Sequence, residues 1–217
     1  MARPQIASDK QIFDAAERVL ARSGPDAFTL AEVAKEVGLS RAAIILRFKS
    51  TQALKIMLMS RLHEKFIAFV DTFPKTPGGD QLLEIAASIG SRAGSRKGSS
   101  SYFAGYHSNL GDRVIADLEV RRGAALREAI IRAMPKVAIT RESAADVFMA
   151  HVTGSLINAL SRTDTTIRAH IVKRTAEWLR LARIPYSEAK VVELSGSAAS
   201  NAHKTTNKRV AKKRLAA

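Results

Sequence analysis

The side chains that most often carry catalysis or bind metals are few in this chain and poorly spaced for either task. The sequence has no cysteine, which excludes disulfides, a thiolate nucleophile and a thiolate zinc site. No two histidines are four residues apart, the spacing that places two zinc ligands on one helical face; they are His63, His107, His151, His170 and His203. We also find no glycine-rich phosphate loop and no nucleophile–base pair at a recognisable spacing. We therefore expect no enzyme: no catalytic residue, no metal site and no cofactor.

Positive charge is the chemical feature that stands out. The 217 residues carry 35 Lys and Arg against 20 Asp and Glu, which gives a formal net charge of +15. Such an excess attracts polyanions, and DNA is the most densely charged common one. The charge is most concentrated in residues 195–217, which hold no acidic side chain; their basic residues are Lys204, Lys208, Arg209, Lys212, Lys213 and Arg214.

One segment has the residue types that a DNA-reading helix pair needs. It reads TLAEVAKEVGLSRAAIILRF and begins at Thr29. Thr29 and Ser40 are helix-capping residues, and Gly38 lies between them, where a tight turn needs glycine. Ile44 and Phe48 give the second helix a buried face. The pattern predicts a helix-turn-helix, whose second helix enters the major groove of DNA.

Helical periodicity continues through most of the chain, so the elements that position this segment are helices too. Apolar residues recur at spacings of three and four, and no strand pattern is present. We expect helices near residues 9–23, 29–37, 40–48, 50–73, 82–89, 102–109, 112–134, 140–162 and 164–184. The Gly/Ser-rich and basic residues 90–101 are expected to be mobile in part. No apolar run reaches the roughly 18 residues of a membrane span, so we expect no membrane partner.

The N-terminal region resembles the TetR family of bacterial transcriptional regulators. The matching stretch, IFDAAERVLARSGPDAFTLAEVAKEVGLSRAAIILRFKSTQAL, begins at Ile12. It combines I-x-x-A-A, a threonine opening the second helix, A-x-x-x-G-L-S and F-K-S. The resemblance implies an all-α fold: a three-helix DNA-binding domain at 1–50, then a helical effector-binding and dimerisation domain at 51–187. The basic segment 188–217 is expected to be a disordered tail.

The same resemblance implies a function. Such a protein would be a cytoplasmic, nucleoid-associated homodimer. It would bind a palindromic DNA operator, most often as a repressor, and a small-molecule effector would modulate it. The family's DNA contacts fall on Thr29, Ser40, Arg41, Ala42, Ala43, Ile45, Leu46, Arg47 and Lys49.

Two positions depart from the family pattern. Ile45 stands where the family usually has a tyrosine that holds a phosphate, and Thr51 stands where it often has lysine. Both changes remove polar DNA anchors. We hypothesise that Arg47, Lys49, Arg3 or the basic tail compensates.

Two further sites are expected in the helical body. Aromatic and polar residues that suit an effector cavity, or equally a plain core, are Phe66, Phe69, Tyr102, Phe103, Tyr106, His107 and His151. The resemblance implies that the last two long helices form the dimer interface. The residues expected at this interface are Ala150, Gly154, Asn158, Ile171 and Trp178. Two of them, Ala150 and Gly154, are small and allow the helices to approach closely.

Two alternatives remain open on the sequence. A protein that coats DNA without sequence preference also fits the net charge and the basic tail, and it would show a steep salt dependence. A family member that has lost operator binding fits Ile45 and Thr51.

Overall fold

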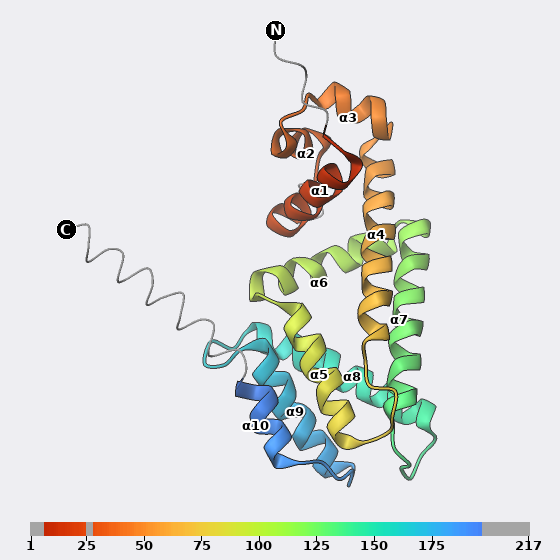
Figure 1. The fold of residues 1–217 in the computed structure, drawn as a ribbon, viewed down its shortest axis with the longest axis vertical. Coiled ribbons are helices and arrows are strands. Elements are labelled where there is room, and N and C mark those ends of the chain that lie inside the picture. Colours follow the sequence, from red (N-terminus) through yellow and green to blue (C-terminus); the bar gives the residue numbers. More distant parts are fainter. Residues whose placement is uncertain (1–6, 25–27, 197–217) are drawn as a thin grey trace, which may run out of the picture. The chain divides into compact units, whose positions relative to one another are not determined.

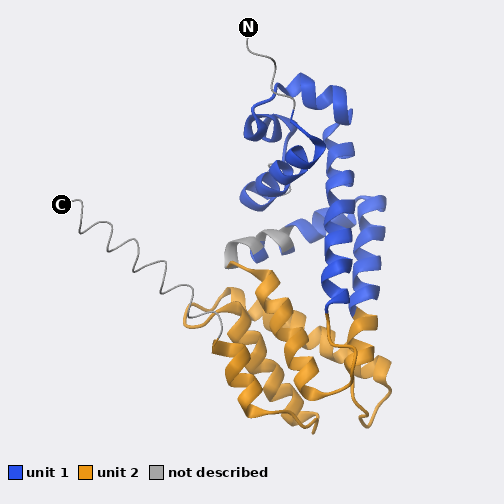
Figure 2. Ribbon diagram, in the orientation of Figure 1, with its two compact units in different colours: residues 1–72, 97–126 blue, residues 73–96, 127–217 orange. Residues whose placement is uncertain are grey.

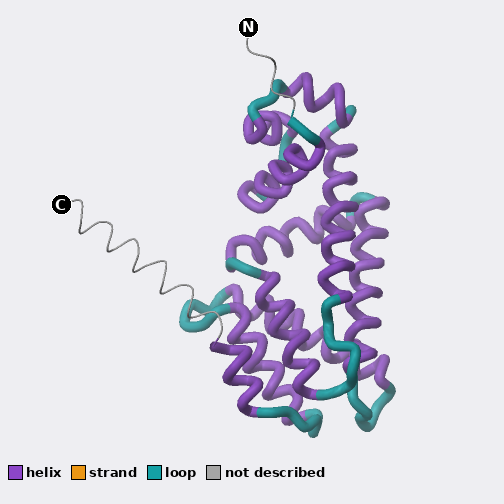
Figure 3. The backbone as a smooth tube through the Cα atoms, in the orientation of Figure 1, coloured by secondary structure: helices purple, strands orange, loops and turns teal. Residues whose placement is uncertain are grey.

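The structure, a computed structural model, describes residues 7–24 and 28–196, except for the side chains of residues 96–98, 101, 102 and 104. Helices and connecting loops account for all of the described backbone, with no strand (Figures 1 and 3). The predicted all-α fold class is therefore confirmed. The helices are α1 (Asp9–Ser23), α2 (Leu30–Val37), α3 (Arg41–Phe48), α4 (Thr51–Asp71), α5 (Gly79–Ala93), α6 (Arg96–Leu110), α7 (Arg113–Ala133), α8 (Arg141–Leu160), α9 (Ile167–Leu181) and α10 (Glu188–Gly196).

The helices pack into two compact units (Figure 2). Unit 1 comprises Met1–Thr72 and Lys97–Leu126, and unit 2 comprises Phe73–Arg96 and Arg127–Ala217. The packing therefore groups α4 with the three N-terminal helices. The predicted boundary between the two functional domains, at residue 50, instead places α4 in the second domain. The reason for the observed grouping is local, because α4 contacts both α1 and α3.

In unit 1, one apolar core holds the N-terminal helices together. Its fully buried members come from four helices and lie on the faces that the periodicity predicts; they are Ile12, Ala16, Val19, Val33, Ile44, Leu54 and Leu58. The rings of Phe13 and Phe48 meet edge to face, with centroids 5.6 Å apart. This core fixes the orientation of α3 relative to α1 and α4.

In unit 2, α9 is the central helix and contacts α5, α8 and α10. It lies so close to α5 that a Cβ atom added at Gly90 would be 2.8 Å from the Cα of Arg168. Gly90 is thus part of a tight helix crossing. The Gly/Ser-rich residues 90–101, expected to be mobile in part, lie mostly in helices, because α5 runs to Ala93 and α6 begins at Arg96.

The helix α10 corrects the prediction of a disordered tail from residue 188. Leu194 is buried, and its carbonyl oxygen accepts a hydrogen bond from Arg168 Nε at 2.7 Å. Lys190 Nζ forms an ion pair with Glu84 at 2.7 Å, which ties α10 to α5. The rest of the predicted tail, residues 197–217, lies outside the described residues.

Helix starts follow the capping residues closely. Ser8 caps α1 with a complete capping box shared with Gln11, and Thr140 caps α8. Thr166 caps α9, two residues after the expected start at 164, and the Asp164 carboxylate pairs with Arg162. None of the helices in the described part of the chain combines the length and apolar composition needed to cross a bilayer.

Candidate nucleic-acid interface

The turn between α2 and α3 is built as the sequence predicts. The Thr29 hydroxyl accepts a hydrogen bond from the backbone N–H of Glu32 at 3.2 Å and so caps α2. Gly38 ends α2 in the left-handed conformation, with φ 70° and ψ 27°. This conformation lets the N–H of Leu39 donate to the carbonyl of Ala34 at 2.9 Å. The chain then turns over Gly38, Leu39 and Ser40 and starts α3.

The helix α3 is anchored on one side and exposed on the other. The Ser40 hydroxyl accepts from the N–H of Ala43 at 3.1 Å, and Ile44 and Phe48 are buried in the core of unit 1. Most of the predicted DNA contacts lie at the exposed surface: Thr29, Ser40, Arg41, Ala42, Ala43, Leu46, Arg47 and Lys49. Ile45 is half buried and packs against the core.

Arg41 is the basic residue at the start of this exposed face. Its side chain has neither an ion-pair nor a hydrogen-bond partner among the described residues. An unpaired guanidinium can bind a phosphate, or the O6 and N7 atoms of guanine, in bidentate fashion. Arg41 thus has the exposure and the chemistry that DNA recognition requires.

Arg47 is already occupied within the protein, although the sequence suggests that it is free. Its Nε lies 2.6 Å from Asp9 Oδ1, and its Nη1 donates to the carbonyl of Ala7 at 2.6 Å. These contacts fasten the end of α3 to the start of α1. In the structure Arg47 positions α3 against α1, and its phosphate contact in place of a residue-45 anchor stays a prediction.

Lys49 joins α3 to α4 in a rarely populated backbone conformation. Its φ is 69° and its ψ is −49°, and the N–H of Ser50 donates to the carbonyl of Phe48 at 2.8 Å. This is a γ-turn of the positive-φ type, which is strained for any residue with a Cβ atom. The turn leaves the Lys49 side chain exposed beside the end of α3.

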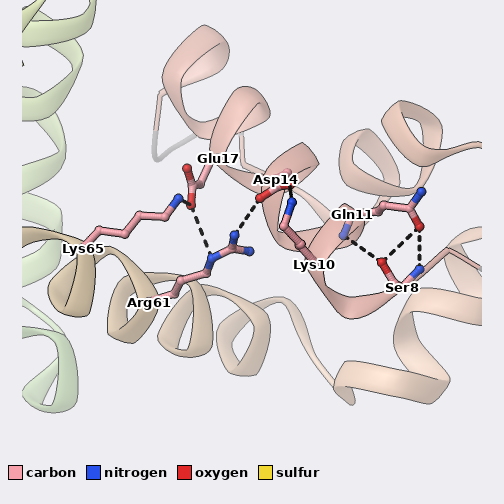
Figure 4. Close-up of polar contacts among 7 residues, drawn as sticks. All are labelled: Ser8, Lys10, Gln11, Asp14, Glu17, Arg61 and Lys65. Carbon is pink, nitrogen blue, oxygen red and sulfur yellow. Dashed lines mark hydrogen bonds and ion pairs between the residues drawn. The ribbon is translucent and has the colours of Figure 1, made fainter. Parts of the chain in front are cut away.

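Ion pairs fix α1 against its neighbours. Figure 4 shows Arg61 and Lys65 of α4 reaching Asp14 and Glu17 of α1, with Arg61–Asp14 at 2.7 Å and Lys65–Glu17 at 2.5 Å. Hydrogen bonds from Lys10 and Arg61 hold the pKa of the Asp14 carboxyl below its usual range. These contacts tie α4 to α1.

A second pair of contacts joins α1 to α2. Glu36 accepts hydrogen bonds from Arg18 at 2.9 Å and from Arg22 at 3.0 Å. The two guanidinium groups hold the pKa of the Glu36 carboxyl below its usual range. Sequence reasoning missed these ion pairs and Asp9, because the partners come from separate helices.

Among the described residues, Lys49 is the other basic candidate for compensating Ile45; it is exposed, and its Nζ donates to the Leu46 carbonyl at 3.3 Å. Arg3 and the basic tail lie outside the described residues. Thr51 opens α4 and is exposed.

The predicted effector residues are spread over both units. In unit 1, Phe66 and Phe69 of α4 and Phe103 of α6 are half buried, whereas Tyr106 and His107 are exposed. The Arg122 guanidinium lies 4.6 Å from the centroid of the Phe66 ring. His151 belongs to unit 2, where its ring stacks on Trp178 at 6.0 Å. The Tyr102 side chain lies outside the described residues.

Most of the predicted interface residues share the exposed face of α8. Ala150, Gly154 and Asn158 are exposed there, as are the large apolar side chains of Val147 and Ile157, which are 50% and 52% exposed. On α9, Trp178 is half buried against Phe148. Ile171 is fully buried in the core of unit 2. It offers no surface to a partner, which corrects its predicted place.

Comparison with known proteins identifies the N-terminal region. Residues 12–55 match the family model described as bacterial regulatory proteins, tetR family. No curated protein matches the chain.

Solved structures match over nearly the whole fold. A transcriptional regulator from Saccharomonospora viridis in complex with choline is 18% identical, with a TM-score of 0.67 over 82% of this chain and 97% of that one. A TetR transcriptional regulator from Legionella pneumophila is 16% identical, with a TM-score of 0.61 over 80% and 98%. The multidrug binding protein EbrR complexed with imidazole is 20% identical, with a TM-score of 0.58 over 82% and 90%. At these identities the structures share the fold, and the match of residues 12–55 adds the DNA-binding segment. The chain therefore has the fold of these regulators, and its residues 12–55 match the TetR family model.

Proposed function

We propose that this protein binds a palindromic DNA operator as a homodimer, represses transcription there, and is released by a small-molecule effector. The observation that carries the proposal is the construction of α3. The helix is capped by Ser40, held from below by Ile44 and Phe48, and exposed along its outer face. A rigid helix exposed in this way can enter the major groove, where its N-terminal residues meet base edges.

The proposed dimer surface is the outer face of α8. Val147, Ala150, Gly154 and Ile157 follow each other at spacings of three and four, so they lie on one face of the helix. Large exposed apolar side chains around small residues favour close helix–helix contact. A twofold axis through this face would pair two copies of α3 and so match a palindromic operator.

An effector would act by shifting a population of conformers. A ligand that binds better to a dimer with wrongly spaced α3 helices lowers operator affinity. Two observations support a small organic effector. Phe66 and Phe69 in α4 place their ring centroids 6.1 Å apart, and related folds hold choline or imidazole. The contacts of Arg61 and Lys65 with α1 provide a route from α4 to the DNA-binding helices.

Selection of binding sites from random duplexes tests the proposal. The full-length protein is incubated with the pool near physiological salt in the presence of excess unrelated DNA, and bound duplexes are sequenced. We expect one palindromic consensus, with half-sites about one helical turn apart. An unenriched pool bound with a steep salt dependence would instead indicate non-specific coating. An unbound pool would indicate that operator binding has been lost.

A further inference from the structure

We propose that α3 reads its operator chiefly through the C5-methyl groups of thymine, and that Leu46 is the residue that contacts them. This inference rests on the proposed function, because it names the chemistry by which the same helix selects its DNA sequence.

The outer face of α3 is poor in hydrogen-bonding side chains. Three of its exposed residues, Ala42, Ala43 and Leu46, have no polar atom beyond the backbone. Arg47 is exposed as well, but its guanidinium is held by the start of α1. Arg41 is thus the polar side chain of α3 that has no partner among the described residues. A face of this composition cannot recognise several bases by hydrogen bonding.

The apolar residues form one strip directly opposite the buried anchors. Ala42 and Leu46 are four residues apart, and Ala43 and Leu46 are three apart, so all three share the side of the helix away from Ile44 and Phe48. Leu46 is 77% exposed, which is unusual for a leucine in a helix whose other large apolar side chains are buried or half buried. The two alanines on either side of it allow the helix backbone to come close to a flat surface.

The major groove offers one apolar group for such a strip. Adenine, guanine and cytosine expose hydrogen-bonding atoms there, and thymine adds a methyl group. A base edge pressed against Leu46 or an alanine loses its water without gaining a partner, which disfavours polar edges. A thymine methyl gains apolar contact instead. Lys49 at one end of the strip complements the charge of the DNA backbone, and Arg41 at the other end can pair with one guanine.

Methyl removal tests the inference atom by atom. Once the operator is selected, each thymine is replaced in turn by deoxyuridine, which lacks only the C5-methyl, and the Kd of the full-length protein is measured. Burial of one methyl group is worth roughly a fourfold change in affinity. We expect at least one thymine whose replacement weakens binding by about that factor, and by about fifteenfold when both half-sites are changed.

Variants connect that methyl group to Leu46. In Leu46→Ala the deoxyuridine penalty should fall below about twofold, because the side chain that contacts the methyl is gone. In Arg41→Ala overall affinity should drop while the penalty stays unchanged. Ile139→Ala is the matched control, because Ile139 is also exposed but lies in the loop between α7 and α8. It should change neither affinity nor penalty.

The outcomes separate this inference from the proposed function. A palindromic site in which every thymine tolerates deoxyuridine, or an equal penalty in Leu46→Ala and the parent, overturns the methyl contact and leaves operator binding intact. Failure to enrich any site overturns the proposed function, and the methyl contact with it.

Discussion

Replacing Gly154 by leucine separates dimerisation from folding. Gly154 is exposed in the middle of α8, and a Cβ atom added there would meet nothing within 4 Å in the protomer. Glycine in a helix interior costs about 1 kcal/mol relative to alanine, so a larger residue should not destabilise the protomer. If α8 forms the interface, the same substitution fills the contact with extra atoms.

The expected effect is large because a twofold interface contains the residue twice. Overpacking costs about 1–3 kcal/mol at each site, or about 2–6 kcal/mol for the dimer. The dimer Kd should therefore rise roughly thirtyfold or more.

Sedimentation equilibrium over a range of protein concentrations measures this Kd, and circular dichroism melting checks the fold. Gly123→Leu in α7 is the matched control, since a Cβ atom at Gly123 also meets nothing within 4 Å. It should leave the dimer intact. A Gly154→Leu protein that dimerises as tightly as the parent would refute the placement of the interface on α8.

Three further substitutions test how the protomer is built. Lys49→Gly should raise the free energy of unfolding by about 1 kcal/mol in urea titrations, because glycine adopts the positive φ of the turn without strain, whereas Lys49→Ala should not. Stability should fall between pH 7.5 and 5.5, because burial lowers the pKa of His151 and of His170 below the ordinary 6.5, so the unfolded chain binds protons that the folded chain does not. The midpoint of urea unfolding measures this fall, and His170→Leu should make the midpoint depend less on pH. Arg47→Ala should weaken operator binding without changing its salt dependence, because the guanidinium is paired with Asp9.

Each of these expectations has an opposing result. Equal stabilisation by glycine and alanine at position 49 would show that the turn is not strained. The pH slope is informative because carboxyl groups with lowered pKa, such as Asp14, titrate well below this window. An unchanged slope in His170→Leu would remove His170 as its cause. A fall of about one in the salt slope of Arg47→Ala would indicate a phosphate contact.

Local signals in the sequence were enough to predict the DNA-binding helices. Thr29, Gly38 and Ser40 act on backbone groups within a few residues of themselves, so their identities specify where α2 ends and α3 begins. Ile44 and Phe48 reveal the buried face by spacing alone. The exposure of Leu46 follows from the same periodicity.

Contacts between distant residues could not be predicted in this way. Arg47 is paired with Asp9, which lies 38 positions earlier in the chain. Because no local pattern links the two residues, the sequence suggested that the Arg47 side chain was free. The helix α6 forms through a Gly/Ser-rich sequence of low helical propensity, which shows that tertiary packing outweighs local preference there. For α10, the spacing of the apolar Val191 and Leu194 could have predicted a helix. The basic residues after position 196 obscured this signal, because they favour a disordered tail.

The central claim is that the exposed face of α3 selects a DNA sequence, and competition binding of the selected operator against a scrambled duplex tests it most directly. Arg41→Ala is compared with the parent, with Arg132→Ala of α7 as a control for the loss of one exposed cation. Arg41→Ala should lose about five- to 150-fold in operator affinity and much less in affinity for the scrambled duplex, while Arg132→Ala should keep the parent's selectivity. An Arg41→Ala protein as selective as the parent would contradict the central claim.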